Sequence, residues 1–240
     1  MLLDEIGMIA EHGDRRRLHA HLRRVVQLHL AAGGLRRLAS REQLGEALVH
    51  LRRRHALPAL LVDATEGQLH HQDLRIANVA WEAGRGLIVV VNKWDLAEKD
   101  DKASAKFEKT AREKAPFLNW VPFLFTSALT GQRVTKILDL IQLVDEEGRK
   151  RVSTSQVNER LAELLARRQP SQAAGREVKL NYATQVSIQP PTIAVFGNHP
   201  DLVEEHYVRF LHNGFRESWQ FTGNPLRVLM RRKSGGGDRD

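Results

Sequence analysis

The chain has 240 residues, enough for one large or two modest domains, and 42% of them are apolar, which allows a sizeable core. It has no cysteine, which excludes disulfides and thiolate metal sites and is compatible with a reducing cytosol, and its longest aliphatic run, about five residues, is far too short to span a bilayer. The net charge of +8 lies in the flanks, because residues 1–59 hold 11 Arg against 6 acidic residues while residues 60–151 are neutral, and basic flanks favour phosphate backbones or acidic partners.

Residues 1–56 form an atypical segment that is rich in Arg, His and Leu, lacks Lys and shows no clear helical period. Its first residues, MLLDEIGM, lack the basic region of a signal peptide, so we expect a cytoplasmic protein without membrane contact. Two interpretations remain open: a GC-rich gene read in the wrong frame, which would make the chain a truncated or mis-started product, or a disordered arm that binds nucleic acid. We favour the first.

Residues 57–150 alternate between strands and helices. Residues 57–63 predict a short buried strand, and its last residue, Asp63, is expected to cap the polar turn ATEG. Residues 70–83 have apolar positions at helical spacing. Residues 87–91, LIVVV, are aliphatic without alternation, as in a strand that is covered on both faces. Strand, helix and strand in this order predict a right-handed crossover between parallel neighbours.

The same alternation continues beyond Asp95. A highly charged segment, AEKDDKASAKFEKTAREKA, predicts a solvated surface helix, residues 121–128 predict another buried strand, and a helix is expected from Gly131. The order β-α-β-α-β-α is typical of the second half of a doubly wound α/β domain.

Residues 151–233 predict a separate small α+β domain of order α-β-β-α-β. Alternating residues predict that Val178, Leu180, Tyr182 and Val186 share one face of its first strand, and Asn213-Gly214 is expected near the end of its second helix. The tail, residues 234–240, is expected to be disordered.

Asn92, Lys93 and Asp95 follow the LIVVV strand, at the edge where open α/β sheets bind ligands. A carboxylate there can accept two parallel hydrogen bonds from the N1–H and the exocyclic amine of guanine, a pair of donors that adenine lacks. Asn92 can tie the loop to a neighbouring segment, and the stem of Lys93 can cover the base. Ser127 and Ala128 follow the next strand, where a backbone N–H can meet the guanine carbonyl oxygen.

NKWD with a later TSALTG resembles the guanine-specificity motifs of translation-factor-type GTPases. Together with DATEG and PPTIAVFGNHPDLVEEHYVRFLHNGFRE, these motifs make residues 57–233 similar to the Der or EngA family of double GTPases in ribosome assembly. The resemblance implies an incomplete P-loop-GTPase-like sheet followed by a KH-like domain, and GTP or GDP bound with Mg²⁺. It also implies the large ribosomal subunit or its rRNA as partner, with guanine read by residues Asn92, Lys93, Asp95, Ser127 and Ala128.

The sequence departs from the family pattern in its phosphate-binding half. It contains no G-x-x-x-x-G-K-[ST] loop, and the family's switch threonine and D-x-x-G cannot be identified in their places. We therefore predict no catalytic residue and no Mg²⁺ ligand in this chain, although the resemblance implies a GTP hydrolase. The alternative is a nonenzymatic module that binds RNA or the ribosome through basic residues of the C-terminal domain, namely Arg167, Arg168, Arg176, Lys179, Arg227, Arg231, Arg232 and Lys233. The sequence does not define an oligomeric state.

Overall fold

The computed structural model describes residues 59–97, 102–172 and 175–232. The predictions for residues 1–56 and 234–240 lie outside these residues. The described chain forms two compact units: one runs to Glu147 and includes Thr222–Pro225, and the other comprises Gly148–Phe221 and the residues from Leu226 onward.

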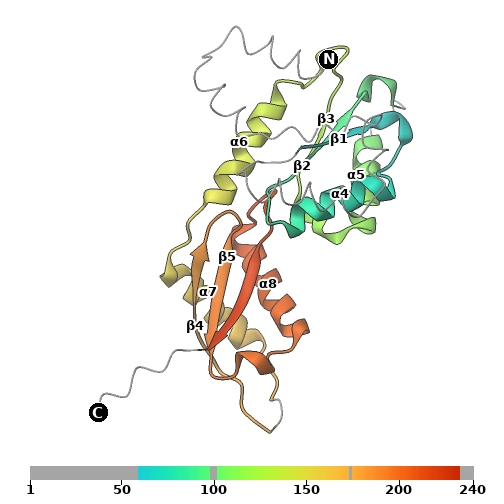
Figure 1. The fold of residues 1–240 in the computed structure, drawn as a ribbon. Helices are drawn as coiled ribbons and strands as arrows, with labels where there is room; N and C mark the ends of the chain where they lie inside the picture. The colour runs from blue at the N-terminus through green and yellow to red at the C-terminus, as the bar shows by residue number, and fades with distance from the viewer. Residues whose placement is uncertain (1–58, 98–101, 173–174, 233–240) are drawn as a thin grey trace. The chain divides into compact units, whose positions relative to one another are not determined.

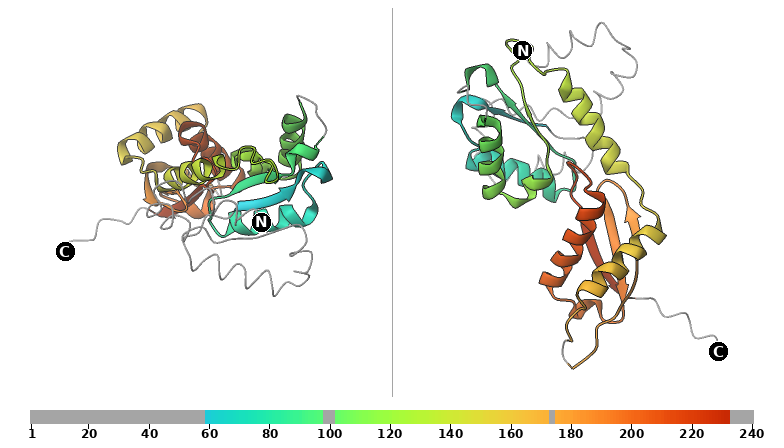
Figure 2. Two further views of the ribbon diagram at one scale, coloured as in Figure 1. Left: turned by 90° about the horizontal axis from the view of Figure 1, so that it is seen from above. Right: turned by 180° about the vertical axis from the view of Figure 1, so that it is seen from behind.

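The first unit is built on a parallel sheet of order β1-β2-β3, with β1 at Ala59–Asp63, β2 at Ile88–Asn92 and β3 at Phe123–Phe125. Figures 1 and 2 show helices on both faces of this sheet. They are α4 (His71–Glu82), α5 (Ala103–Lys114) and α6 (Lys136–Arg149), with the short helices η3 (Ala64–Glu66), η4 (Trp94–Leu96) and η5 (Pro116–Trp120) between them. The predicted parallel, doubly covered sheet is confirmed.

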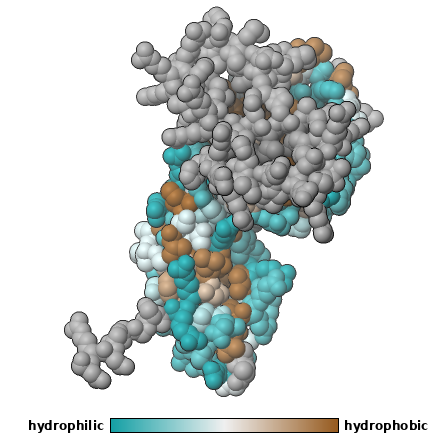
Figure 3. Space-filling view, viewed as in Figure 1, coloured by the Kyte–Doolittle hydropathy of each residue, from teal (hydrophilic) through white to brown (hydrophobic). Residues whose placement is uncertain are grey.

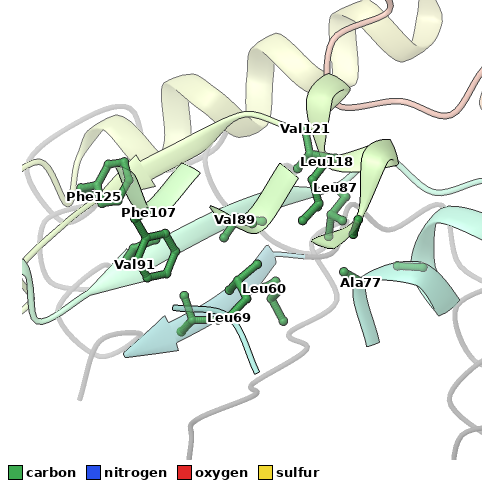
Figure 4. Close-up of a cluster of buried hydrophobic side chains, with 14 of the residues drawn as sticks. Leu60, Leu69, Ala77, Leu87, Val89, Val91, Phe107, Leu118, Val121 and Phe125 are labelled. Atoms are coloured by element: carbon green, nitrogen blue, oxygen red, sulfur yellow. The ribbon is translucent and has the colours of Figure 1, made fainter. Parts of the chain in front are cut away.

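Strand β2 explains why the aliphatic run does not alternate with polar residues. Val89 and Val91 point into a core formed with α4, α5 and η5, drawn in Figure 4. Ile88 and Val90 point to the opposite face and pack against α6. Both faces of the strand therefore exclude water, and each buried aliphatic side chain contributes about 1.5–3 kcal/mol.

Two elements of the first unit are shorter than predicted. Strand β3 has three residues rather than the eight of 121–128, because the chain leaves the sheet after Phe125. Helix α6 begins at Lys136 rather than Gly131, since Gly131 and Arg133 both adopt left-handed conformations, with φ of 73° and 58°. Residues 126–135 form a loop between β3 and α6, and this loop contains two of the candidate site residues, Ser127 and Ala128.

The segment Thr222–Pro225, which the predicted boundary assigns to the C-terminal domain, belongs to the first unit. The N–H of Gly223 donates to the Trp120 carbonyl, and its own carbonyl accepts from Leu87 N–H, both at 2.7 Å. A Cβ at Gly223 would lie 2.5 Å from Val144 Cγ2, so only glycine allows this close approach.

The second unit has the predicted order α-β-β-α-β: α7 (Thr154–Arg167), β4 (Leu180–Ser187), β5 (Thr192–Gly197), α8 (Glu205–Trp219) and β6 (Arg227–Arg232). A short helix, η6 (Pro200–Leu202), precedes α8. Strand β5 is central, antiparallel to β4 and parallel to β6. Ser153 and Gln156 form a capping box that starts α7.

Two local predictions in the second unit are wrong. Helix α8 does not end at Asn213-Gly214 but continues to Trp219, because Gly214 serves packing: a Cβ there would lie 2.3 Å from Leu164 Cδ2. The alternation along β4 also fails, because the register shifts between Leu180 and Tyr182. Ala183 consequently takes the core position, Tyr182 stacks on Phe196 with ring centroids 4.4 Å apart, and Val186 is exposed.

Candidate functional site

Polar residues gather where the strands of the parallel sheet end. Asp63 and Asn92 are the last residues of β1 and β2, and their Cα atoms are register partners. The loop after β3 joins them, since Asn92 Oδ1 accepts the N–H of Ala128 at 3.0 Å. Asn92 therefore ties two loops together as predicted, across 36 residues of chain.

The loop after β3 is held firmly. The N–H of Thr126 donates to Val91 O at 2.8 Å, and the N–H of Ser127 donates to Gln132 O at 3.1 Å. The Ser127 hydroxyl accepts from Thr130 N–H at 3.2 Å. Ser127 is fully buried and Ala128 is nearly so. The N–H groups of Ser127 and Ala128 thus both have protein partners, and a base carbonyl at Ala128 would have to share that donor with Asn92.

Asp95 lies in η4, directly after β2. The turn into this helix is made by Lys93, which adopts a left-handed conformation with φ of 61°. Trp94 N–H then donates to Thr126 O at 3.0 Å, so the turn is fixed to the neighbouring loop. The structure thereby brings Asn92, Asp95 and the Ser127–Ala128 loop to the same edge.

One oxygen of Asp95 is unusual. Its Oδ1 is buried, yet it has no hydrogen-bond partner among the residues that the structure describes. A buried polar atom without a partner costs about 1–3 kcal/mol, and more when it carries charge. An N–H donor brought by a ligand would remove that cost.

Lys93 makes an ion pair that the sequence did not reveal. Its Nζ lies 2.6 Å from Asp63 Oδ2. The other oxygen of Asp63 accepts from the N–H and the hydroxyl of Thr65, at 2.9 and 2.7 Å. The predicted turn cap is therefore confirmed, but the carboxylate also holds the lysine. The sequence did contain one signal for this ion pair: Asp63 ends one predicted strand and Lys93 follows the end of the next, so parallel pairing would bring them together.

The pKa shifts of this pair agree with its geometry. Burial on its own raises the pKa of Asp63, but the hydrogen bonds from Lys93 and Thr65 outweigh burial and leave the pKa below 3.8. The hydrogen bond to Asp63 raises the pKa of Lys93 above 10.5.

Trp94 packs rather than offering a surface for a base. Its ring lies 4.4 Å from that of Phe125, centroid to centroid, and it contacts the buried cluster drawn in Figure 4. Trp94 is therefore a packing residue. Lys93 remains the residue whose stem can lie along a base.

Within the described ranges, no group of three or more His, Cys, Asp or Glu side chains is arranged to hold a metal ion. Over the same ranges, no helix combines the length and apolar character that crossing a bilayer requires. The site just described combines acceptor oxygens of Asn92 and Asp95 with one cation, Lys93, which is paired with Asp63.

Three of the eight basic residues predicted to form a patch on the second unit make ion pairs with acidic neighbours. Arg167 lies 3.8 Å from Glu217, Lys179 lies 2.9 Å from Glu177, and Arg232 lies 3.5 Å from Asp201. Figure 3 shows hydrophobic residues in brown among hydrophilic ones in teal on this unit; Val186 and Leu229 are large exposed hydrophobic residues of its described part. The predicted basic patch is thus partly neutralised by its own neighbours.

Two family models match the chain. Residues 151–231 match the KH-domain-like model of EngA bacterial GTPase enzymes, C-terminal, and residues 56–146 match the elongation factor Tu GTP binding domain. The match to the elongation factor Tu domain contains all five candidate site residues.

Curated relatives give the same result. GTPase Der of Gemmatimonas aurantiaca is 62% identical over 207 residues, which cover 84% of this chain and 47% of that protein. The same enzyme of Chloroherpeton thalassium is 40% identical, covering 86% of this chain and 48% of that protein, and that of Desulfitobacterium hafniense is 47% identical, covering 72% and 39%. The chain therefore spans about half the length of the curated relatives it matches.

Among solved structures, Era in complex with MgGDPNP and nucleotides 1506–1542 of 16S ribosomal RNA aligns with 80% of this chain and 69% of that one. Its TM-score is 0.35 and its sequence identity 15%, a similarity too low to assign a role to any residue of this chain.

Proposed function

This chain belongs to the Der/EngA GTPases, of which it spans the C-terminal region, and on that premise we propose that the polar edge of the β1-β2-β3 sheet binds the base of a guanine nucleotide. The observation that carries the proposal is the buried Oδ1 of Asp95, which has no protein partner among the described residues. The N1–H and exocyclic amine of guanine would satisfy both oxygens of this carboxylate. Adenine presents an acceptor at N1 and would leave it unpaired.

The other residues have supporting roles. Asn92 holds the Ser127–Ala128 loop against β2, which keeps that loop beside Asp95. The Ala128 N–H is the donor that a guanine carbonyl oxygen would share. Lys93 would cover one face of the base with its methylene stem, which is half exposed. GTP or GDP is thus the proposed ligand, with Mg²⁺ and the phosphates held by groups outside the five site residues.

At the level of the cell, we propose a cytoplasmic role in the biogenesis of the ribosome, through contact with the large subunit or its rRNA. The support is the family of the relatives and the KH-like match of residues 151–231. The relatives are named GTPases, but no catalytic residue for GTP hydrolysis is identified among the described residues of this chain, so we propose GTP binding rather than hydrolysis.

Titration with a fluorescent GDP analogue tests the base site. We expect micromolar binding that unlabelled GDP displaces and ADP does not, because only guanine offers paired donors to Asp95. Asp95→Ala should abolish binding, whereas Asp139→Ala, an exposed aspartate on α6, should leave it unchanged. Asp95→Asn should lose GDP and gain xanthosine diphosphate, whose base carries a carbonyl in place of the amine.

The stability of Asp95→Asn separates binding from folding. Because Oδ1 has no partner to lose, urea denaturation should show an unfolding free energy equal to or above that of the unmodified protein. Absence of GDP binding, together with co-sedimentation with large ribosomal subunits at low salt, would overturn the guanine site in favour of a nonenzymatic ribosome-binding module.

A further inference from the structure

The ion pair between Lys93 and Asp63 is asymmetric. The Asp63 side chain is only 14% exposed, whereas that of Lys93 is 55% exposed. Asp63 is itself immobilised, because its second oxygen accepts both the N–H and the hydroxyl of Thr65. The Asp63 carboxylate is therefore held in place, and it fixes the long side chain of Lys93 at its terminal ammonium group.

The backbone directs Lys93 toward this anchor. Asp63 and Asn92 are register partners at the ends of parallel strands, so Lys93 is the first residue beyond the neighbouring strand, β2. Its left-handed conformation is rare for a residue with a side chain and persists where surrounding contacts determine it. Trp94 N–H, bonded to Thr126 O, is one such contact, and the ion pair is another.

We propose that Asp63 is a positioning residue of the guanine site, which acts by holding the ammonium of Lys93 so that its methylene stem lies ready against the base. This inference rests on the proposed function. A free lysine loses rotamer freedom when it packs on a ligand, and an anchor that orders the chain beforehand removes that loss from binding. The lowered pKa of Asp63 and the raised pKa of Lys93 are consistent with a persistent pair.

The pairing also predicts what Lys93 does not do. Since its ammonium is neutralised by Asp63, Lys93 should contribute to binding of the base and little to binding of phosphates. The effect of breaking the pair should therefore be similar for guanosine, GMP and GDP. A lysine that contacted phosphates would instead matter more as phosphates are added.

A double-mutant cycle tests the proposal with the full chain. Asp63→Asn keeps an oxygen that can cap Thr65 but removes the charge that holds Lys93, so we expect GDP to bind about 10-fold more weakly. Lys93→Ala should weaken binding by at least as much. In the Lys93→Ala background, Asp63→Asn should have no further effect, because its route of action is gone.

Three controls keep the result interpretable. Asp63→Ser, which also retains a capping oxygen, should reproduce the loss if Asp63→Asn folds poorly. Asp73→Asn alters another capping aspartate, bonded to His70 N–H at 2.9 Å, and should change affinity less than twofold. Far-UV circular dichroism and urea midpoints establish that each variant folds.

Each outcome bears on a different claim. Failure of the unmodified chain to bind GDP would overturn the proposed function, and this inference with it. Normal GDP binding that Asp63→Asn leaves within twofold would overturn only the role of Asp63. The same would follow if Asp63→Asn weakened binding equally with and without Lys93, since Asp63 would then act through its turn alone.

Discussion

The two sheets of this protein use polar side chains in opposite ways. In the mixed sheet of the second unit, buried polar groups bond to the backbone: Gln185 accepts from Val152 N–H at 2.8 Å and donates to Lys150 O at 3.0 Å. In the parallel sheet of the first unit, polar groups stand beyond the strand ends, and one carboxylate oxygen of Asp95 is buried without a described partner.

This difference distinguishes polar groups that stabilise the fold from polar groups that are available to a ligand. Gln185 forms hydrogen bonds with two backbone groups that would otherwise lack a partner, so it stabilises the fold without a ligand. Asp95 is a destabilising feature unless something binds it. Local departures from polar satisfaction are expected at functional sites, and Asp95 is such a departure at the edge of the parallel sheet.

The largest expected change in stability comes from removing the buried polar group of the second unit's sheet. Gln185→Leu should lower the unfolding free energy by about 2–4 kcal/mol, because two backbone groups lose their partners in a buried place. Urea denaturation followed by circular dichroism measures the loss. Gln142→Leu, on the exposed face of α6, is the matched control and should change stability by less than about 0.5 kcal/mol. Equal losses in the two variants would contradict the assigned role.

A smaller loss of stability is expected at Asn92, which both holds a loop in place and belongs to the candidate site. Asn92→Ala should lower the unfolding free energy by about 1–2 kcal/mol, because the Ala128 N–H loses its acceptor. The same variant should bind GDP more weakly, since the loop carrying Ser127 and Ala128 is no longer tied to β2. Asn119→Ala, at an exposed position in η5, provides the control for both measurements. Retention of full stability in Asn92→Ala would show that the loop is held by its backbone bonds alone.

The smallest effect concerns pH and the second unit. Burial raises the pKa of Tyr207 to about 12, and its hydroxyl donates to Arg168 O at 2.6 Å. Because the folded pKa lies above the unfolded value of 10.0, the stabilisation is complete below pH 10 and is lost as pH rises toward 12.

Tyr207→Phe tests this by removing the hydroxyl. It should cost about 1 kcal/mol at pH 8, and the difference from the unmodified protein should shrink above pH 10. The chain has two tyrosines, so an absorbance titration of the variant should also lack the late phase near pH 12. A late phase that persisted in Tyr207→Phe would contradict the assignment.

Much of the fold can be predicted from the sequence because it depends on interactions between residues that are close along the chain. The unbroken aliphatic run of β2 indicates a strand covered on both faces, and Val89 and Ile88 indeed pack into two different buried clusters. The start of α7 is specified by Ser153 and Gln156, which cap it within one turn. The alternation of strands and helices likewise needed no knowledge of distant contacts.

The errors occur where a distant contact decides. Gly214 suggests a helix end when considered by itself, but the close approach of Leu164 requires a glycine in mid-helix. The alternation of β4 fails because a register shift against β5 reverses the faces after Leu180. In both cases the residue type is explained by a partner that is remote in sequence.

Composition, periodicity and spacing are local properties of the chain, and from them one can predict the order of the elements, the family motifs and the edge of the sheet where a ligand is expected. No such local property reveals that Asn92 bonds to Ala128, that Asp63 pairs with Lys93 or that one oxygen of Asp95 has no described partner. These features depend on strand register and on the direction of each side chain, which are set when separate segments pack against one another.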